Sequence, residues 1–112
     1  MRKIVLVLIS LILISCGKDK VKIKISDFSK KQEVTLTPYK LKPYAMLKIH
    51  IKGQINDTIK INYNLYGNTD FFLTGEVDTL LVQTDYYGEG PVTLLFDPYR
   101  ATEGEILIDF NL

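Results

Sequence analysis

Few residues in this chain are of the types that usually carry out catalysis. The 112 residues include one histidine, His50, and one cysteine, Cys16. A catalytic histidine needs a nucleophile or a carboxylate within reach, whereas the neighbours of His50 on the same face of an extended strand are the cations Lys48 and Lys52. The sequence also lacks the Gly-x-Ser-x-Gly, His-Glu-x-x-His and glycine-rich phosphate-loop motifs. We therefore interpret His50 as a solvated strand residue and expect the protein not to be an enzyme.

Tyrosine and charged residues are concentrated in two predicted turns. The first turn carries Asp85, Tyr86 and Tyr87, and the second carries Tyr99 and Arg100. Tyrosine presents a large amphipathic ring and is common in binding surfaces. If the protein binds a ligand, these five residues are our first hypothesis for the site, and a glycan or another envelope protein is the expected kind of partner.

The acids of the same region offer oxygen ligands of the kind that calcium takes, six to eight at a time. The candidates are Asp85 and Glu89 in the first turn and Asp97, Glu103 and Glu105 around the second. The Asp-x-Asp-x-Asp-Gly spacing of regular calcium loops is absent, and one cysteine with one histidine makes no zinc site. We therefore predict no metal and no cofactor, and keep calcium binding as an alternative.

The first sixteen residues have the pattern of a secretory signal. Arg2 and Lys3 precede an apolar run of eleven residues, 4–14, that only Ser10 interrupts. At about 1.5 Å per helical residue this run spans roughly 17 Å, too short for a bilayer core of about 30 Å. A charged start, a short apolar stretch and then a small residue are typical of a signal peptide.

The end of this segment carries a more specific motif. Leu13-Ile14-Ser15-Cys16 resembles the lipobox of bacterial lipoproteins. The resemblance implies that residues 1–15 are removed, that the thiol of Cys16 receives a diacylglyceryl group and that the new amino group is acylated. The chemistry is sound, because a thiolate is a strong nucleophile and two or three acyl chains hold a protein on a membrane where one chain does not. The implied partner of Cys16 is therefore a membrane.

Two further resemblances concern the compartment. Gly17, rather than an aspartate, follows the cysteine, and in lipoproteins of enteric bacteria this favours the outer membrane. The segment Lys18-Asp19-Lys20 and the richness in Lys, Ile, Asn and Tyr are similar to small envelope lipoproteins of Bacteroidota. We expect a lipid-anchored protein of the cell envelope at the outer membrane, with the periplasmic and the surface face both left open.

The rest of the chain favours strands over helices. Apolar and polar residues alternate with period two, so that Leu47, Ile49 and Ile51 share one face of an extended segment. Residues 77–86 and 92–96 are more continuously apolar, which predicts central strands. Residues that favour turns separate the segments, at 53–57, 67–70, 75–76, 88–91 and 97–104.

Seven or eight strands at about ten-residue spacing predict an all-β, antiparallel two-sheet sandwich, Ig/CUB-like in architecture. A small closed barrel is the alternative. We expect a signal peptide at residues 1–15, a lipid-anchored tether and possible first strand at 16–32, and the sandwich domain at 33–112. One segment resembles the closing hairpin of CUB-type sandwiches: Phe96-Asp97-Pro98-Tyr99-x-x-x-x-Gly104-x-Ile106-x-Ile108-x-Phe110.

Charge is distributed unevenly along the chain. Residues 16–60 hold eleven lysines and four acids, whereas residues 61–112 hold one arginine and nine acids. The formal net charge is only +1, which gives no reason to expect a nucleic-acid partner. Either the folded protein is dipolar, with its basic part facing anionic lipid, or the topology interleaves the two halves and opposite charges pair across strands.

The sequence therefore predicts a membrane-anchored lipoprotein that acts by binding or as a structural element, without catalysis. The alternative is an accessory module that binds a glycan, a protein or calcium through the acidic, tyrosine-rich turns. The two hypotheses differ in one structural requirement, because the alternative needs Asp85, Tyr86, Tyr87 and Asp97 to converge on one concavity.

Overall fold

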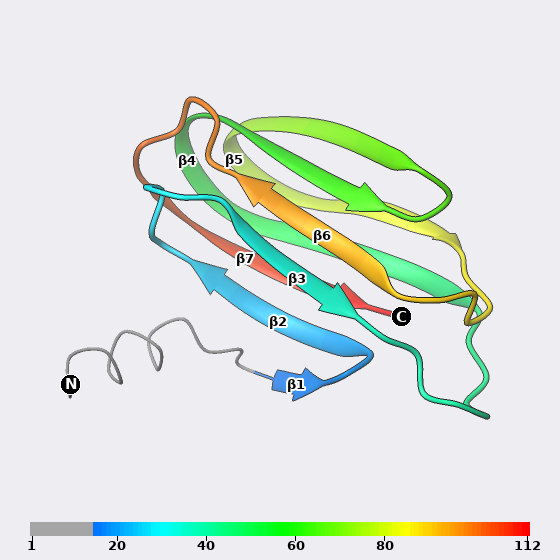
Figure 1. Ribbon diagram of the computed structural model, residues 1–112. Coiled ribbons are helices and arrows are strands. Elements are labelled where there is room, and N and C mark those ends of the chain that lie inside the picture. The colour runs from blue at the N-terminus through cyan, green and yellow to red at the C-terminus, as the bar shows by residue number, and fades with distance from the viewer. Residues whose placement is uncertain (1–14) are drawn as a thin grey trace.

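The computed structural model describes residues 15–112, and over this range the chain is all-β (Figure 1). The predicted signal peptide lies, apart from Ser15, outside the described residues. Within residues 15–112, none of the elements is a helix of the length and apolarity that crossing a bilayer requires. The strands are β1 (Ser15–Gly17), β2 (Lys20–Ile25), β3 (Gln32–Leu36), β4 (Met46–Asn64), β5 (Asn68–Asp85), β6 (Val92–Asp97) and β7 (Gly104–Asn111).

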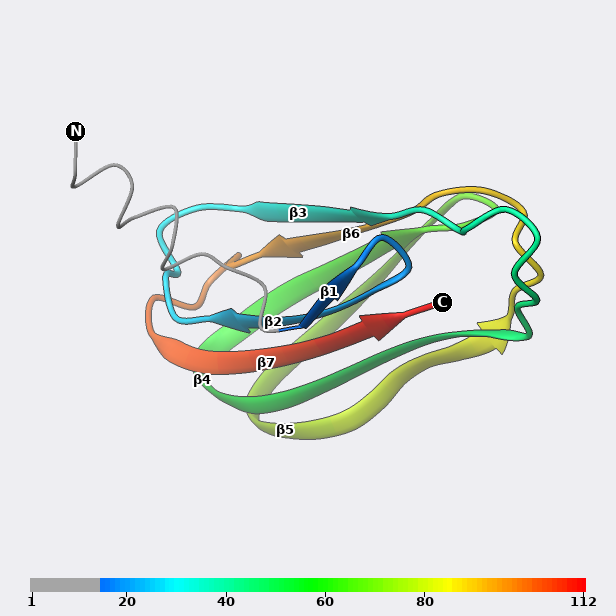
Figure 2. The same cartoon turned by 90° about the horizontal axis from the view of Figure 1, so that it is seen from below.

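The strands form one antiparallel sheet that curls over on itself into a nearly closed barrel (Figures 1 and 2). The order is β1-β2-β7-β4-β6-β3, and β5 pairs with β4. The first part of β4 pairs with β7 and the last part pairs with β6, so the long β4–β5 hairpin carries both halves of the barrel. The predicted antiparallel all-β class is confirmed. The Ig/CUB-like sandwich of two separate sheets is not, because β4 and β5 run without a break from one half to the other.

Two of the predicted turns are bends inside strands. Residues 53–57 lie within β4 and residues 75–76 lie within β5. The two bends face each other, since Ile55 pairs with Gly75 and the register shifts between Ile55 and Ile59. Glycine and asparagine mark a bulge as readily as a turn. The prediction that the chain reverses at these points was therefore wrong, and the hairpin instead folds over there.

The core is made by the inward-facing residues that alternate along the strands. Leu47, Ile49 and Ile51 are completely buried on the predicted face of β4, and Ile106 and Ile108 are completely buried on β7. Burying an aliphatic side chain of this size stabilises the fold by about 1.5–3 kcal/mol. The period-two pattern therefore identified the inner face of each of these strands correctly.

The prediction for the segment at residues 77–86 needs a correction. In the described part of the chain β5 pairs with β4 alone, so it is an edge strand rather than a central one. Leu80 is 45% exposed and Phe72 is 56% exposed on this edge. The apolar run misled because Leu80 lies on the outside of the barrel, so not all of its apolar residues face the core. The run at residues 92–96 does form a central strand, β6, between β4 and β3.

The expected tether contributes to the barrel. β2 pairs with β7 along its whole length, from Lys20 opposite Asn111 to Ile25 opposite Ile106. Val21 and Ile23 are buried in the same core as the rest of the domain. The expected tether therefore supplies strands β1 and β2 to the sheet, and residues 26–31 form the loop that leads to β3.

Candidate functional site

The two turns predicted to form one binding site lie at opposite ends of the barrel (Figures 1 and 2). The turn after β5 lies beside the start of β4, because Asp85 pairs with Met46. The turn after β6 lies beside the bend of the hairpin, where the amide of Asn56 donates to the carbonyl oxygen of Glu103 at 3.1 Å. Asp85, Tyr86 and Tyr87 therefore do not converge with Tyr99 and Arg100 on a common concavity.

Tyr86 belongs to the core. Its side chain is completely buried, and its ring packs edge-on against Tyr44 with 5.8 Å between ring centroids. Its hydroxyl donates to the carbonyl oxygen of Gly90 at 2.5 Å, and burial raises the pKa of the phenol. The hypothesis that Tyr86 contacts a ligand was therefore wrong, because the ring closes the end of the barrel instead. Tyr87, the next residue, is 68% exposed.

Tyr99 and Arg100 form a small exposed patch at the other end. Tyr99 packs edge-on against Phe72 on β5, with 5.5 Å between ring centroids. The guanidinium of Arg100 lies 5.4 Å from the centroid of the Tyr99 ring. Both rings are about half exposed, so the patch is a feature of the outer surface.

The candidate calcium ligands are also separated. Asp85 and Asp97 lie at opposite ends of the barrel, so one cation cannot bind both (Figure 1). Among residues 15–112, no three side chains of His, Cys, Asp or Glu are grouped so as to hold a metal ion.

His50 has a partner that the sequence did not reveal. Its Nε2 atom lies 2.9 Å from Oδ1 of Asp78, on the neighbouring strand β5. Both side chains are well exposed, which agrees with the prediction of a solvated strand histidine. Asp78 was missed because only the pairing of β4 with β5 brings the two together, and that pairing contains a bulge between Ile49 and His50.

The charges of the two halves of the chain interleave on the outer face of the sheet. Lys22 on β2 pairs with Asp109 on β7, and Lys52 on β4 pairs with Asp78 on β5. Nζ of Lys24 lies 3.4 Å from Oε2 of Glu105. Exposed pairs of this kind contribute at most about 1 kcal/mol each. Their main consequence is that much of the charge asymmetry seen along the sequence is cancelled locally.

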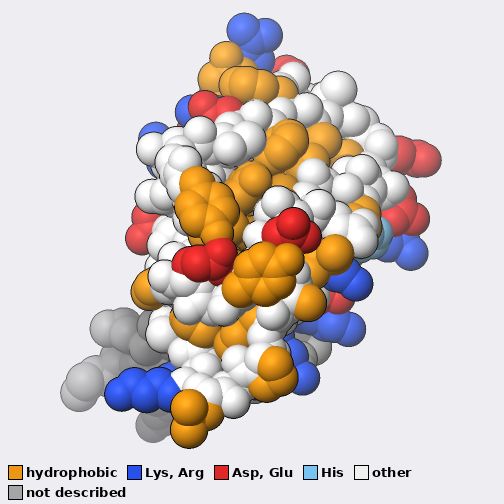
Figure 3. Space-filling view, turned by 90° about the vertical axis from the view of Figure 1, so that its right-hand side faces the viewer, with side chains coloured by type: hydrophobic (Ala, Val, Ile, Leu, Met, Phe, Trp, Pro, Cys, Tyr) orange, Lys and Arg blue, Asp and Glu red, His pale blue; other side chains and the backbone are white. Residues whose placement is uncertain are grey.

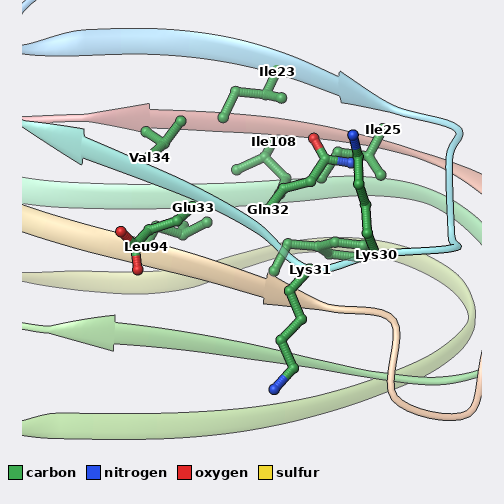
Figure 4. A pocket seen from close by; sticks show the side chains of 10 residues that line it. Ile23, Ile25, Lys30, Lys31, Gln32, Glu33, Val34, Leu94 and Ile108 are labelled. Carbon is green, nitrogen blue, oxygen red and sulfur yellow. The ribbon is translucent and has the colours of Figure 1, made fainter. Parts of the chain in front are cut away.

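A cleft of about 320 Å³ opens where the barrel does not close, between β2 and β3 (Figure 4). One end of this seam is tied shut, because the amide of Thr37 donates to the carbonyl oxygen of Lys18 at 2.6 Å. Towards the other end the loop of residues 26–31 connects the two strands. The cleft is lined by four strands and this loop: Ile23, Ile25, Lys30, Lys31, Gln32, Glu33, Val34, Leu94, Phe96 and Ile108.

The floor of the cleft is apolar and its lip is polar. Ile25, Leu94 and Ile108 form the floor and are nearly completely buried, and Val34 is half-buried beside them. Lys30 and Gln32 extend towards the β2 side, where Ile25 lies (Figure 4). Lys31 points away and lies 3.8 Å from Asp97.

This arrangement can take a slender apolar group and place an anionic or hydrogen-bond-accepting head beside Lys30 and Gln32. The lining residues include no nucleophile activated by a base, so the chemistry that they support is binding. Sequence analysis did not find this site, because its residues come from strands that are far apart in the chain.

No family model matches the chain, and no curated protein matches it. Among solved structures, the chain is similar to one described as "Crystal structure of PirA", with a TM-score of 0.53 and 10% sequence identity. The similarity covers 88% of this chain and 98% of that chain. At this identity the likeness shows the fold alone: a protein of nearly the same extent arranges its chain in a related way.

Proposed function

We propose that this chain is a lipid-anchored protein of the cell envelope that acts by binding rather than by catalysis, with Cys16 as its anchor. One observation carries the proposal: the sequence Leu13-Ile14-Ser15-Cys16 resembles the lipobox of bacterial lipoproteins. Cys16 and Gly17 pair in register with Val21 and Lys20 of β2. The predicted anchor is thus joined directly to the barrel through the pairing of β1 with β2.

The cleft at the seam is the proposed binding site. Its volume of about 320 Å³ lies at the lower end of the range of roughly 300–1,000 Å³ that is usual for small-molecule sites. An apolar floor with Lys30 at the lip favours an acyl chain, or a similarly slender apolar group, that ends in an anionic head. The proposed location is the outer membrane, for which Gly17 is the supporting residue.

The alternative, a module that binds a glycan, a protein or calcium through the tyrosine-rich turns, has less support. Its two turns lie at opposite ends of the barrel, and Tyr86 is buried (Figure 1). One observation still favours a second surface for a protein or glycan: the exposed rings of Phe72 and Tyr99 and the guanidinium of Arg100 lie together.

The anchor is tested by metabolic labelling with an alkyne fatty acid in a bacterial host that processes lipoproteins. We expect the natural chain to be labelled and Cys16→Ala to be unlabelled, because the thiol is the predicted site of the lipid. Ser15→Ala is the matched control, since it keeps a small residue before the cysteine and should retain the label. Undiminished labelling of Cys16→Ala would show that the anchor is not there.

The cleft is tested by titrating decanoate into the folded protein and following the affinity by calorimetry. We expect Val34→Trp, which fills the cleft, to weaken binding at least tenfold, a loss of about 1.4 kcal/mol. Thr35→Trp, the neighbouring exposed position on the outer face of β3, should bind as the natural chain does. Equal affinities of the two variants would remove the cleft from consideration as the site.

A further inference from the structure

The loop between β3 and β4 projects an apolar side chain into solvent. Leu41 is 104% exposed and Tyr39 is 44% exposed, and Lys40 and Lys42 flank Leu41. We call Tyr39, Lys40, Leu41 and Lys42, together with the adjacent Lys18, the basic tip. A single exposed leucine is common on protein surfaces. Leu41 is unusual in its backbone, since its φ of 65° lies in the left-handed region that side chains with a Cβ disfavour.

The tip is held in this conformation by a network around one buried carboxylate. Asp19 is only 2% exposed, and its Oδ2 atom lies 2.5 Å from Nζ of Lys42. The hydroxyl of Tyr44 donates to the same oxygen at 2.9 Å and accepts a hydrogen bond from the amide of Tyr39 at 2.7 Å. Contacts to the residues on both sides of Leu41 therefore fix the loop, and the fold keeps Leu41 pointing outward against its own backbone preference.

The tip lies directly beside the predicted anchor. Nζ of Lys18 lies 4.7 Å from the centroid of the Tyr39 ring, and the amide of Lys18 donates to the Tyr39 hydroxyl at 3.4 Å. Lys18 is only two residues after Cys16. A lipid on Cys16 therefore brings the tip to the membrane surface without any intervening linker.

The chemistry of the tip matches an anionic bilayer surface. Lysines near such a surface are attracted by about 1 kcal/mol each, and their long side chains reach up to the headgroups while an apolar neighbour inserts. Tyrosine is enriched at the same depth. The tip has three cations. Asp19 forms an ion pair with one of them, Lys42, so Lys18 and Lys40 remain to interact with an anionic surface.

Other acids also lie at this end of the barrel. Asp109 lines a pocket together with Lys42 and pairs in register with Lys22. Asp85 and Glu89 lie at the turn after β5. Glu89 there accepts hydrogen bonds from the hydroxyl of Tyr66 and the amide of Tyr87. Figure 3 looks onto this end and shows hydrophobic side chains at the surface, with acidic side chains among them and basic ones towards the edges of the view.

We propose that the basic tip is a second membrane contact, which inserts Leu41 among the headgroups of an anionic phospholipid membrane beside the lipid on Cys16. The orientation rests on the proposed anchor, whereas the affinity of the tip for anionic lipid does not. Two contacts orient a protein where one leaves it free to rotate. The end with the basic tip then faces the membrane, and the end with Tyr99 faces away.

The chain contains no tryptophan, so one introduced tryptophan reports its own environment. Leu41→Trp is made in the full chain and reconstituted into vesicles of phosphatidylcholine and phosphatidylglycerol that contain brominated acyl chains, which quench a tryptophan in contact with the bilayer. Tyr99→Trp is the matched control at the far end. We expect the tryptophan at position 41 to be quenched and the one at position 99 not to be. Lys40→Trp reports the same contact if Leu41→Trp melts below the natural chain.

Equal quenching at positions 41 and 99, or none at either, would overturn the proposal. The role of the lysines is checked in vesicles of phosphatidylcholine alone, where quenching at position 41 should fall; unchanged quenching there would exclude recognition of anionic lipid. The mass of the peptide that contains Cys16 is measured on the same preparation, because a lipid on the thiol increases this mass. An unlipidated cysteine with quenching at position 41 would refute the anchor and leave the tip standing, whereas a lipidated cysteine without quenching would refute the tip alone.

Discussion

Gly53 on β4 lies in close contact with the backbone of β7, and Gly104 on β7 lies in close contact with the backbone of β4, at the point where the long hairpin bends. A Cβ on Gly53 would lie 2.0 Å from the carbonyl oxygen of Glu105, the residue after Gly104. A Cβ on Gly104 would lie 2.3 Å from the carbonyl oxygen of Gln54, the residue after Gly53. Both have a positive φ, near 150°. The absence of two side chains is therefore what lets β7 begin against the bend of β4.

We expect Gly53→Ala and Gly104→Ala each to destabilise the protein by about 2–4 kcal/mol. Forcing atoms into a packed site costs about 1–3 kcal/mol, and the positive φ adds about 1 kcal/mol or more. The control is Gly75→Ala, because Gly75 has a φ of 75° but a Cβ there would meet no atom within 4 Å. Its loss of unfolding free energy should stay at about 1 kcal/mol. Urea denaturation measures all three. Similar losses for Gly53→Ala and Gly75→Ala would contradict the close approach.

Tyr86 and Tyr87 are adjacent in sequence but should respond differently to truncation. Tyr86→Ala empties a fully buried site and is expected to cost about 3–5 kcal/mol, as for other large aromatic residues in cores. Tyr87→Ala should change stability by about 0.5 kcal/mol or less, because its ring is exposed. Thermal melts followed by circular dichroism distinguish the two. Equal melting temperatures would mean that the ring of Tyr86 does not close the barrel.

The ion pair of Asp19 and Lys42 should make part of the stability depend on pH. The hydrogen bond from Lys42 lowers the pKa of Asp19 below its ordinary value of 3.8, and the same bond raises the pKa of Lys42 above 10.5. A lowered carboxyl pKa stabilises the fold above the unfolded value, and this stability is lost as the pH falls through the folded pKa. A raised lysine pKa stabilises the fold below the unfolded value of 10.5, and this stability is lost as the pH rises through the folded pKa. The contribution is therefore full between about pH 4 and pH 10.

We expect Asp19→Asn to melt below the natural chain at pH 7, and the difference to shrink as the pH falls below 3.8. Glu33→Gln, at an exposed position of β3, is the control and should show no such trend. The measurement is a series of thermal melts from pH 7 to pH 2.5. A difference that stays constant over this range would show that the charge of Asp19 does not stabilise the fold.

The sequence by itself determined which face of most strands is buried. Alternation is a local property, so Ile49 and Ile108 could be assigned to the core from their immediate neighbours alone. The lipobox resemblance at Leu13-Ile14-Ser15-Cys16 is local in the same sense, and it leads to a prediction that can be tested without any structure. The glycines between the apolar segments could also be recognised locally. The local sequence did not show whether each one marks a chain reversal or a bend within a strand.

The tertiary structure decided which strands are neighbours, and with that the sites. Gly53 and Gly75 predict two turns when they are taken separately and one folded hairpin when β4 is paired with β5. The turn at Tyr86 predicts an exposed side chain. In the folded protein the ring of Tyr44 packs against Tyr86, which is buried. The cleft exists only because β2 and β3, each paired on its other side, stop short of one another. Such relationships depend on contacts between residues far apart in the chain, and no pattern within a short window of sequence carries that information.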